Sequence, residues 1–111
     1  MDQLTIRDKI GVNYMLLELS GALNSYTISE LQDKVFSFII DSNVVLDMAQ
    51  VIQIDSSGVG VFLASFNDTE MTGTKLFIMN PSEPVRHALE RTGFYDMFNI
   101  IHSVTEVEVS A

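Results

Sequence analysis

The residues from Val51 to Gly60 constrain the fold of this chain more than any other stretch. An apolar run rich in β-branched residues ends abruptly there at Asp55-Ser56-Ser57-Gly58. Apolar residues then return at a helical spacing, at Val59, Phe62, Leu63 and Phe66. This pattern predicts a strand that runs into a tight turn and then into the first turn of a helix.

The Asp-Ser-Ser junction admits two interpretations. Asp and Ser are favoured at helix starts because their side-chain oxygens accept hydrogen bonds from the unpaired N–H groups of the first turn. The same N–H groups and the helix dipole favour negative charge, so Ser56 or Ser57 can also carry or meet a phosphate. The local pattern alone favours the helix cap, because caps far outnumber phosphate sites.

Composition and charge exclude several classes of function. The 111 residues carry a formal net charge of −9 with only six Lys and Arg, whereas a nucleic-acid or anionic-membrane partner requires a basic face. An acidic surface instead suits a basic protein partner. The chain contains no cysteine, which excludes disulfides, thiol nucleophiles and zinc–thiolate sites. Without an apolar leader or a membrane-length apolar run, the expected location is the cytoplasm.

Hydrophobic spacing before the key stretch predicts a hairpin, a helix and a buried strand. Two apolar segments within residues 4–19 indicate paired strands, and Gly21 is expected to end the second one. Thr27 and Glu30 have the spacing of a capping box, so a helix is expected to begin there. The short apolar run over residues 44–46 then suits a strand that is covered on both faces.

Beyond the key stretch, the pattern alternates helices with strands. The helix that starts there is expected to end at about residue 71. A buried strand over Lys75–Met79 follows, and Asn80–Pro84 then initiates another helix that ends near Gly93. An apolar cluster after Gly93 indicates a loop and a short last strand, and residues 104–109 fit either a short helix or an added strand.

This order of elements predicts an α/β fold. We expect a mixed β-sheet of about four to five strands with helices packed against it, in a single domain over residues 1–111. The Asp55-Ser56-Ser57-Gly58 turn would lie where the carboxyl end of a strand meets a helix. That is the usual place for binding sites in open α/β sheets.

The familiar motifs of self-contained active sites are absent from the sequence. Ser57-Gly58-Val59-Gly60 lacks the lysine of a phosphate-binding P-loop, and no serine has the Gly-x-Ser-x-Gly frame of a hydrolase. His87 and His102 are far along the chain from the serines; His87 is expected to be a surface helix residue and His102 a strand-end residue. We therefore expect a binding module without catalytic residues, metal or cofactor, and not an enzyme.

The chain resembles the STAS domain, and within that family the single-domain anti-sigma factor antagonists. Gly21-Ala22-Leu23-Asn24 stands where the family has Gly-Glu-Leu-Asp. Val44–Met48 followed by Ile54–Gly60 matches the family's central strand, turn and helix start. Arg91–Phe94 with Phe98–Ile100 resembles its closing segment, so the resemblance spans nearly the whole chain.

This resemblance implies a switch in which Ser56 is phosphorylated by a partner that is both anti-sigma factor and serine kinase. The unphosphorylated protein would bind this partner and free a sigma factor, and a separate serine phosphatase would reverse the modification. The partner-binding residues implied around Ser56 are Asp55, Ser57, Gly58, Val59, Gly60, Asn24 and Ser25. Asn24 replaces the family's usual aspartate and removes one negative charge.

Other functions remain open at this point. The chain can be a STAS accessory subunit of a transporter or of a lipid-transport ATPase, or a nucleotide-binding regulatory module, with the serine acting only as a cap. A small enzyme fits less well, because no base accompanies the hydroxyls.

Two structural alternatives are also open around the serines. Gly58 and Gly60 can leave the helix start bare for a partner, or they can permit close packing of the helix on a strand. Val59 and Phe62 can form an exposed contact patch, but residues of this type are more often core.

Overall fold

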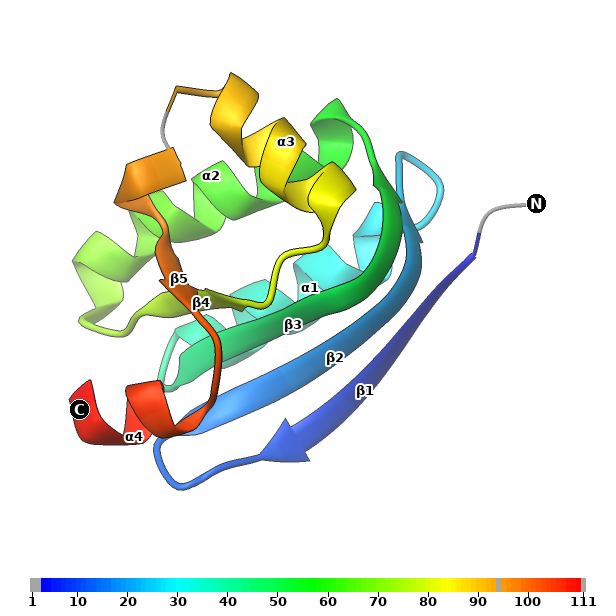
Figure 1. Cartoon of the computed structure of the whole chain (residues 1–111). Helices are drawn as coiled ribbons and strands as arrows, with labels where there is room; N and C mark the ends of the chain where they lie inside the picture. The colour runs from blue at the N-terminus through cyan, green and yellow to red at the C-terminus, as the bar shows by residue number, and fades with distance from the viewer. Residues whose placement is uncertain (1–2, 94, 111) are drawn as a thin grey trace.

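The computed structural model describes residues 3–93 and 95–110, without the side chains of residues 65–71 and 108–110. The elements along the chain are β1 (Leu4–Ile10), β2 (Tyr14–Leu23), α1 (Ile28–Ile39), β3 (Asn43–Ile54), α2 (Ser56–Thr72), β4 (Leu76–Met79), α3 (Glu83–Arg91), η1 (Tyr95–Met97), β5 (Asn99–Ile101) and α4 (Thr105–Ser110). The strands form one five-stranded sheet in the order β1-β2-β3-β4-β5 (Figure 1). Only the β1–β2 pair is antiparallel among these pairings, so the predicted mixed α/β fold is confirmed.

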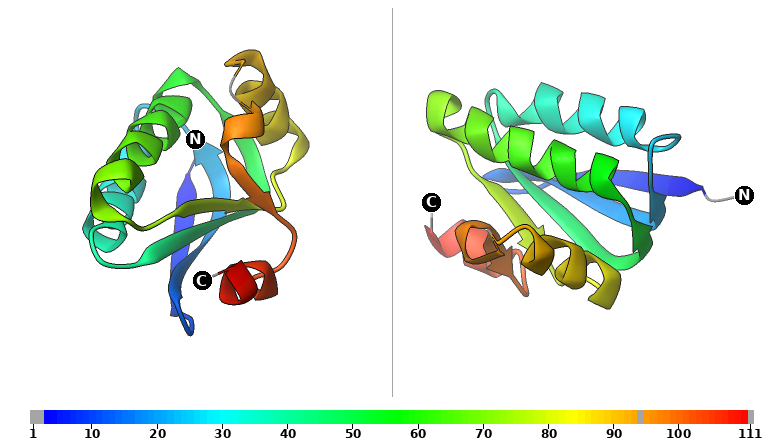
Figure 2. Two further views of the ribbon diagram at one scale, coloured as in Figure 1. Left: turned by 90° about the vertical axis from the view of Figure 1, so that its left-hand side faces the viewer. Right: turned by 90° about the horizontal axis from the view of Figure 1, so that it is seen from above.

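Helices cover both faces of the sheet. Figure 2 shows α1 and α2 side by side on one face, with α3 and α4 on the other. Alternation along β2 buries Leu17 and Leu19 in the main core, where they join the inner faces of α1 and α2. A smaller cluster, which includes Phe77 and Val107, lies beneath α4. The sheet is therefore buried on both faces over β3 and β4, as parallel strands require.

The second and third strands are longer than the sequence predicted. Gly21 does not end β2, which continues to Leu23, and β3 runs unbroken from Asn43 to Ile54. Gly21 has a φ of +115°, and the register between the two strands shifts next to it. Glycine adopts this φ without strain, so β2 continues through the register shift at Gly21 instead of ending there.

The predicted capping box at the start of α1 is not formed. Thr27 occupies the N-cap position, but its side chain makes no capping hydrogen bond. Its hydroxyl instead donates to the backbone oxygen of Ala22 (2.8 Å) and accepts from the N–H of Asn24 (3.0 Å). The Thr27 side chain therefore makes its hydrogen bonds within the loop before α1 and not, as the spacing predicted, to the first turn of the helix.

The carboxyl-terminal half agrees with the sequence more closely. Helix α2 ends at Thr72, and Gly93 follows α3 with a φ of +79°, as a glycine after a helix end often does. The open alternative near the end resolves as a helix, α4. Phe94, a member of the predicted apolar cluster, lies outside the described residues.

Candidate functional site

The start of α2 is capped by Asp55. Its carboxylate oxygen Oδ1 accepts hydrogen bonds from the backbone N–H groups of Ser57 (2.9 Å) and Gly58 (3.4 Å), and its carbonyl accepts from Val59 (3.2 Å). This is the arrangement of an aspartate at a helix N-cap. The helix cap predicted at the Asp-Ser-Ser junction is therefore provided by Asp55 and not by a serine.

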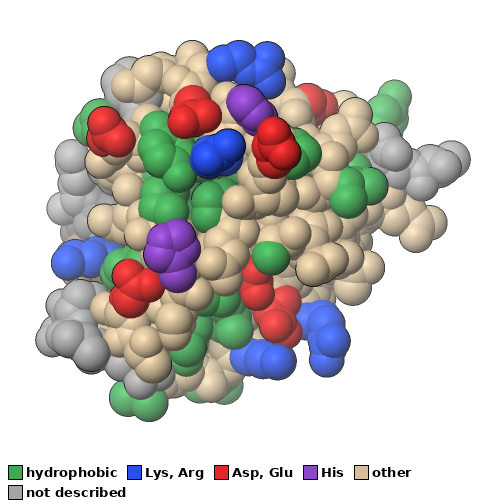
Figure 3. All heavy atoms as spheres, viewed as in Figure 1, with side chains coloured by type: hydrophobic (Ala, Val, Ile, Leu, Met, Phe, Trp, Pro, Cys, Tyr) green, Lys and Arg blue, Asp and Glu red, His purple; other side chains and the backbone are tan. Residues whose placement is uncertain are grey.

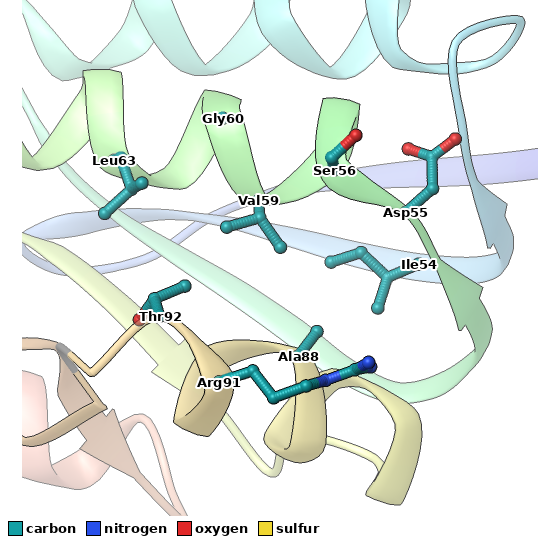
Figure 4. Close-up of a pocket in the computed structure, with 9 residues that line it drawn as sticks. All are labelled: Ile54, Asp55, Ser56, Val59, Gly60, Leu63, Ala88, Arg91 and Thr92. Atoms are coloured by element: carbon teal, nitrogen blue, oxygen red, sulfur yellow. The ribbon is translucent and has the colours of Figure 1, made fainter.

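Because Asp55 caps the helix, neither Ser56 nor Ser57 acts as the cap. Ser56 is the first residue of α2 and is exposed, whereas Ser57 is half-buried. Among the described residues, neither hydroxyl has a hydrogen-bond partner. Figure 4 shows the Ser56 hydroxyl and the Asp55 carboxylate pointing to the same side, away from α3. Ser56 thus presents an accessible hydroxyl at the positive end of a helix.

The loop between β2 and α1 is held against this helix start. The backbone N–H of Asp55 donates to the carbonyl of Leu23 (3.0 Å), which joins the end of β3 to the beginning of the loop. Asn24 comes next, and its Oδ1 accepts from the N–H groups of Tyr26 (2.8 Å) and Thr27 (3.1 Å). The structure therefore brings Asn24 and exposed Ser25 to the same end of the sheet as Ser56, while the Asn24 amide oxygen is turned into its own loop.

The two glycines of the helix start have different surroundings. A Cβ atom added at Gly58 would lie 2.8 Å from Ile54 Cγ1 and 3.2 Å from Leu23 Cβ, which is tighter than normal packing. A Cβ atom added at Gly60 would have no neighbour within 4 Å. Close packing accounts for Gly58, and only Gly60 leaves the helix bare toward solvent.

A groove of about 480 Å³ lies between the start of α2 and helix α3. Its α3 side is formed by Ala88, Arg91 and Thr92, as Figure 4 shows. The side facing them is lined by Ile54, Asp55, Ser56, Val59, Gly60 and Leu63. Val59 is half-buried in this groove, whereas Phe62 is fully buried in the core. Of the two apolar candidates for a contact patch, only Val59 is accessible.

Two exposed apolar residues at this end of the sheet were missed by the sequence reasoning. Tyr26 is 92% exposed in the loop before α1, and Ile52 is 70% exposed near the end of β3. Gly21 pairs with Val51 and the next residue of β2 pairs with Gln53, so Ile52 is the extra residue of a bulge. An aromatic residue within a predicted loop was a usable signal for Tyr26. No sequence signal locates a bulge at Ile52.

The remaining titratable residues form no second site in the described part of the chain. As predicted, His87 is an exposed residue of α3 and His102 directly follows the end of β5; His102 is exposed as well, and His87 Nε2 lies 3.4 Å from Glu83 Oε1. No group of three potential metal ligands occurs among the described side chains. Figure 3 shows acidic and basic side chains interspersed over the α3 face, without a large basic patch. In the described residues, no helix combines the length and apolar character needed to cross a membrane.

Comparison with known proteins identifies the family to which this chain belongs. The model of the STAS domain family matches residues 3–107. The anti-sigma-B factor antagonist of Staphylococcus aureus is 25% identical over 108 residues, which is 96% of this chain and 95% of that protein. The chain belongs to the STAS domain family.

Solved structures share the same fold. An anti-sigma factor antagonist from Mycobacterium paratuberculosis has a TM-score of 0.76 at 18% identity, covering 96% of this chain and 92% of that one. The anti-sigma factor antagonist SpoIIAA in its unphosphorylated form has a TM-score of 0.80 at 17% identity, covering 96% of each chain. The phosphorylated form of Bacillus SpoIIAA has a TM-score of 0.75 at 16% identity, covering 96% and 100% of the two chains.

One relative belongs to a different class. Sulfate transporter 2.1 of Arabidopsis thaliana is 42% identical over 53 residues, which is 48% of this chain but only 8% of the transporter. A stretch similar to about half of this chain therefore also occurs in a much larger protein.

Proposed function

We propose that this protein is an anti-sigma factor antagonist that is switched by phosphorylation of Ser56. Its partner is an anti-sigma factor with serine kinase activity, and a serine phosphatase reverses the modification, all in the cytoplasm. The observation that supports this most is the exposed Ser56 hydroxyl at the start of a helix that Asp55 already caps. The family and the similarity to a full-length antagonist support the same role.

Phosphorylation at this position would act on binding and not on folding. The N–H groups of the first helical turn favour negative charge, so a phosphate there is tolerated by the domain. That SpoIIAA shares this fold in both its phosphorylated and its unphosphorylated form agrees with such tolerance. Ser56 serves the switch as an acceptor, not as a catalytic group.

The effect on a partner would be large. The modification adds roughly −1.5 to −2 charges beside the exposed Asp55 carboxylate. Burying that charge in an interface without a matching cation costs several kcal/mol, and each 1.4 kcal/mol is about a tenfold loss of affinity. Accessible residues around Ser56, among them Val59, Gly60 and Ser25, would form the surface that the partner covers, whereas Gly58 contributes through packing.

The test begins with two baits, Ser56→Ala and Ser56→Asp, in a lysate of the source cell. We expect the Ser56→Ala bait to retain an anti-sigma factor with kinase activity and the Ser56→Asp bait to lose it. The retained protein, purified and supplied with ATP, should phosphorylate the wild-type chain at Ser56. Ser57→Ala is the matched control and should be phosphorylated normally. Modification at another residue, or none, would contradict the proposal.

An accessory subunit of a transporter is the second candidate. The stretch of 53 residues that is 42% identical to part of the Arabidopsis sulfate transporter supports it, because a similar sequence there belongs to a transporter. In that case both baits would retain the same transport protein, regardless of the residue at position 56. If the chain is instead a nucleotide-binding regulatory module, the proteins retained by both baits would change when nucleotide is added and would not depend on the residue at position 56.

A further inference from the structure

Tyr26 has the largest exposed fraction of the large apolar side chains in the described part of the chain, at 92%. A single exposed apolar residue needs no explanation by itself. Tyr26 differs from an ordinary surface residue in two respects, namely the rigidity of its loop and its place beside the start of α2.

The loop that carries Tyr26 is fixed by side-chain hydrogen bonds on both sides of it. Asn24 Oδ1 accepts from the Tyr26 N–H at 2.8 Å and from the Thr27 N–H at 3.1 Å. The Thr27 hydroxyl, in turn, donates to the carbonyl of Ala22 at 2.8 Å. The backbone of Tyr26 is thereby held in one conformation. An aromatic side chain on a fixed backbone loses little conformational entropy when it is buried by a partner.

The same loop is joined to the helix that begins with Ser56. The hydrogen bond from the Asp55 N–H to the Leu23 carbonyl, 3.0 Å long, ties the loop to the residue that caps α2. Tyr26 therefore lies three residues beyond the partner of Asp55, at the same end of the sheet as the phosphate acceptor. A partner that covers Ser56 would meet Tyr26 in the same interface.

We propose that Tyr26 is the apolar anchor by which the anti-sigma factor holds the unphosphorylated protein, an inference that rests on the proposed function. Tyrosine is one of the residues that dominate binding energy in interfaces. The partner surface that fits is an apolar pocket with a basic rim. Its apolar part would take the ring, and its cations would face the Asp55 carboxylate on a chain of net charge −9.

The proposal assigns affinity and switching to two different residues at this end of the sheet. Tyr26 supplies affinity in both states, because phosphorylation of Ser56 does not change its side chain. Ser56 supplies the switch, because its phosphate adds roughly −1.5 to −2 charges to an interface whose cations are already paired with Asp55, so the added charge has no matching cation. Loss of Tyr26 should therefore weaken binding without changing the position of phosphorylation.

The experiment measures the affinity of the purified chain for the anti-sigma factor retained by the Ser56→Ala bait, by calorimetry. Tyr26→Ala should bind about ten- to thirtyfold more weakly than wild type, whereas Tyr26→Phe should stay within about threefold. The matched control is Val12→Ala, because Val12 is 86% exposed at the opposite end of β2 and should leave affinity unchanged. Thermal melting of each variant shows that the fold is retained, as expected for exposed side chains.

Four results would overturn the anchor. Tyr26→Ala binding within about twofold of wild type would exclude it while leaving phosphorylation of Ser56, and thus the proposed function, intact. Equal weakening by Val12→Ala would show that the effect is not specific to this end. Light scattering in which Tyr26→Ala breaks a dimer without changing the affinity for the anti-sigma factor would assign Tyr26 to a second copy of the chain. Failure of the wild-type protein to bind at all would overturn the proposed function and the anchor together.

Discussion

The two ends of the sheet both carry exposed apolar residues, but they differ in what their polar groups do. The carboxyl end of β2 and β3 has Tyr26 and Ile52, and the amino end has Ile10 at 88% exposure, Val12 at 86% and Ile40 at 66%. Grooves of similar size lie at the two ends, about 480 Å³ beside α2 and about 550 Å³ beside the β1–β2 turn. Neither the exposed apolar residues nor the groove volumes therefore distinguish the two ends.

Polar side chains at the amino end are mostly engaged within the fold. Asn43 Oδ1 accepts from the N–H of Lys75 at 2.8 Å, and its Nδ2 donates to the carbonyl of Asn13 at 3.1 Å. The Thr74 hydroxyl donates to the carbonyl of Ile39, and Asn13 Nδ2 donates to the carbonyl of Val107. Asn13 Oδ1 is buried and has no hydrogen-bond partner within the described part of the chain. At the carboxyl end, the Ser56 hydroxyl is exposed and has no hydrogen-bond partner in residues 3–93 and 95–110 as the structure describes them. An accessible polar group on a helix start, and not apolar exposure, marks the candidate site.

The largest effect expected is the loss of partner binding when a negative charge is placed at the carboxyl end. Ser56→Asp should weaken binding to the anti-sigma factor about a hundredfold or more, because a buried unpaired carboxylate costs several kcal/mol. Val12→Asp puts the same charge at the amino end and should change affinity by less than about twofold. Calorimetric titration of both variants decides the comparison. Similar losses for both would mean that charge acts through the whole molecule and that the two ends are equivalent.

Glycines near the two ends should differ in their effect on stability. Gly21 has a φ of +115°, and an added Cβ would clash with the backbone oxygen of Gln3. We expect Gly21→Ala to lower the free energy of unfolding by about 2–3 kcal/mol, since neither the backbone strain nor the clash can be relieved by a side-chain rotation.

Gly11, next to the amino end, is the matched glycine. An added Cβ there would meet the ring of Tyr14, and no positive φ accompanies it. Because a side chain can move, Gly11→Ala should cost less than Gly21→Ala in urea unfolding. A larger loss for Gly11→Ala would show that the Tyr14 ring is fixed as firmly as the backbone.

A smaller contrast is expected within the carboxyl end itself. Gly58→Ala should lower the free energy of unfolding by about 1 kcal/mol, because overpacking against Ile54 outweighs the gain in helix propensity. Gly60→Ala should raise it by about 0.5–1 kcal/mol, since alanine is favoured in helices and the space is open. Urea unfolding measures both values. Stabilisation by both substitutions would show that Ile54 yields easily and that Gly58 has no packing role.

The fold was predictable from the sequence where hydrophobic spacing and turn residues agree. The strand–turn–helix junction at Asp55, helix α2 and the glycine after α3 all follow local rules of this kind. Gly21 shows where those rules fail. A glycine with positive φ can end a strand or can be absorbed within one, and the choice depends on the neighbouring strand, which the local sequence does not contain.

The candidate site was also predictable only in part, because local sequence patterns locate some of its residues and not others. The pattern placed Ser56 at a helix start, and the residues around it that belong to the same contiguous stretch were predictable with it, whereas the groove residues of α3 were not. The contribution of the loop before α1 depends on a backbone hydrogen bond between Asp55 and Leu23, which are far apart in sequence. Thr27 illustrates the limit, because its spacing correctly placed it at the N-cap of α1 while its hydroxyl donates to the carbonyl of Ala22, five residues earlier, and not to the helix.

The smallest effect expected concerns Asn24. Its Oδ1 acts only as an acceptor for two backbone N–H groups, at 2.8 and 3.1 Å, and a carboxylate oxygen can accept both. Asn24→Asp should therefore change the free energy of unfolding by less than about 0.5 kcal/mol, because stronger charge-assisted hydrogen bonds are offset by repulsion from the nearby Asp55.

Binding should respond more than folding to this substitution. The residue 24 side chain is turned into its own loop, so a carboxylate there would act at the rim of the interface and not in the buried part that contains Ser56. It should raise the affinity for a basic-rimmed partner about two- to fivefold at low salt, and the gain should shrink as salt is added. Calorimetry at two salt concentrations tests this, with Asp8→Asn as a control that alters charge by the same amount on β1. If Asn24→Asp destabilises the chain by more than 1 kcal/mol, the loop depends on the Asn24 amide group itself and not only on its oxygen. In that case asparagine would be a structural requirement of this chain and not a change of surface charge.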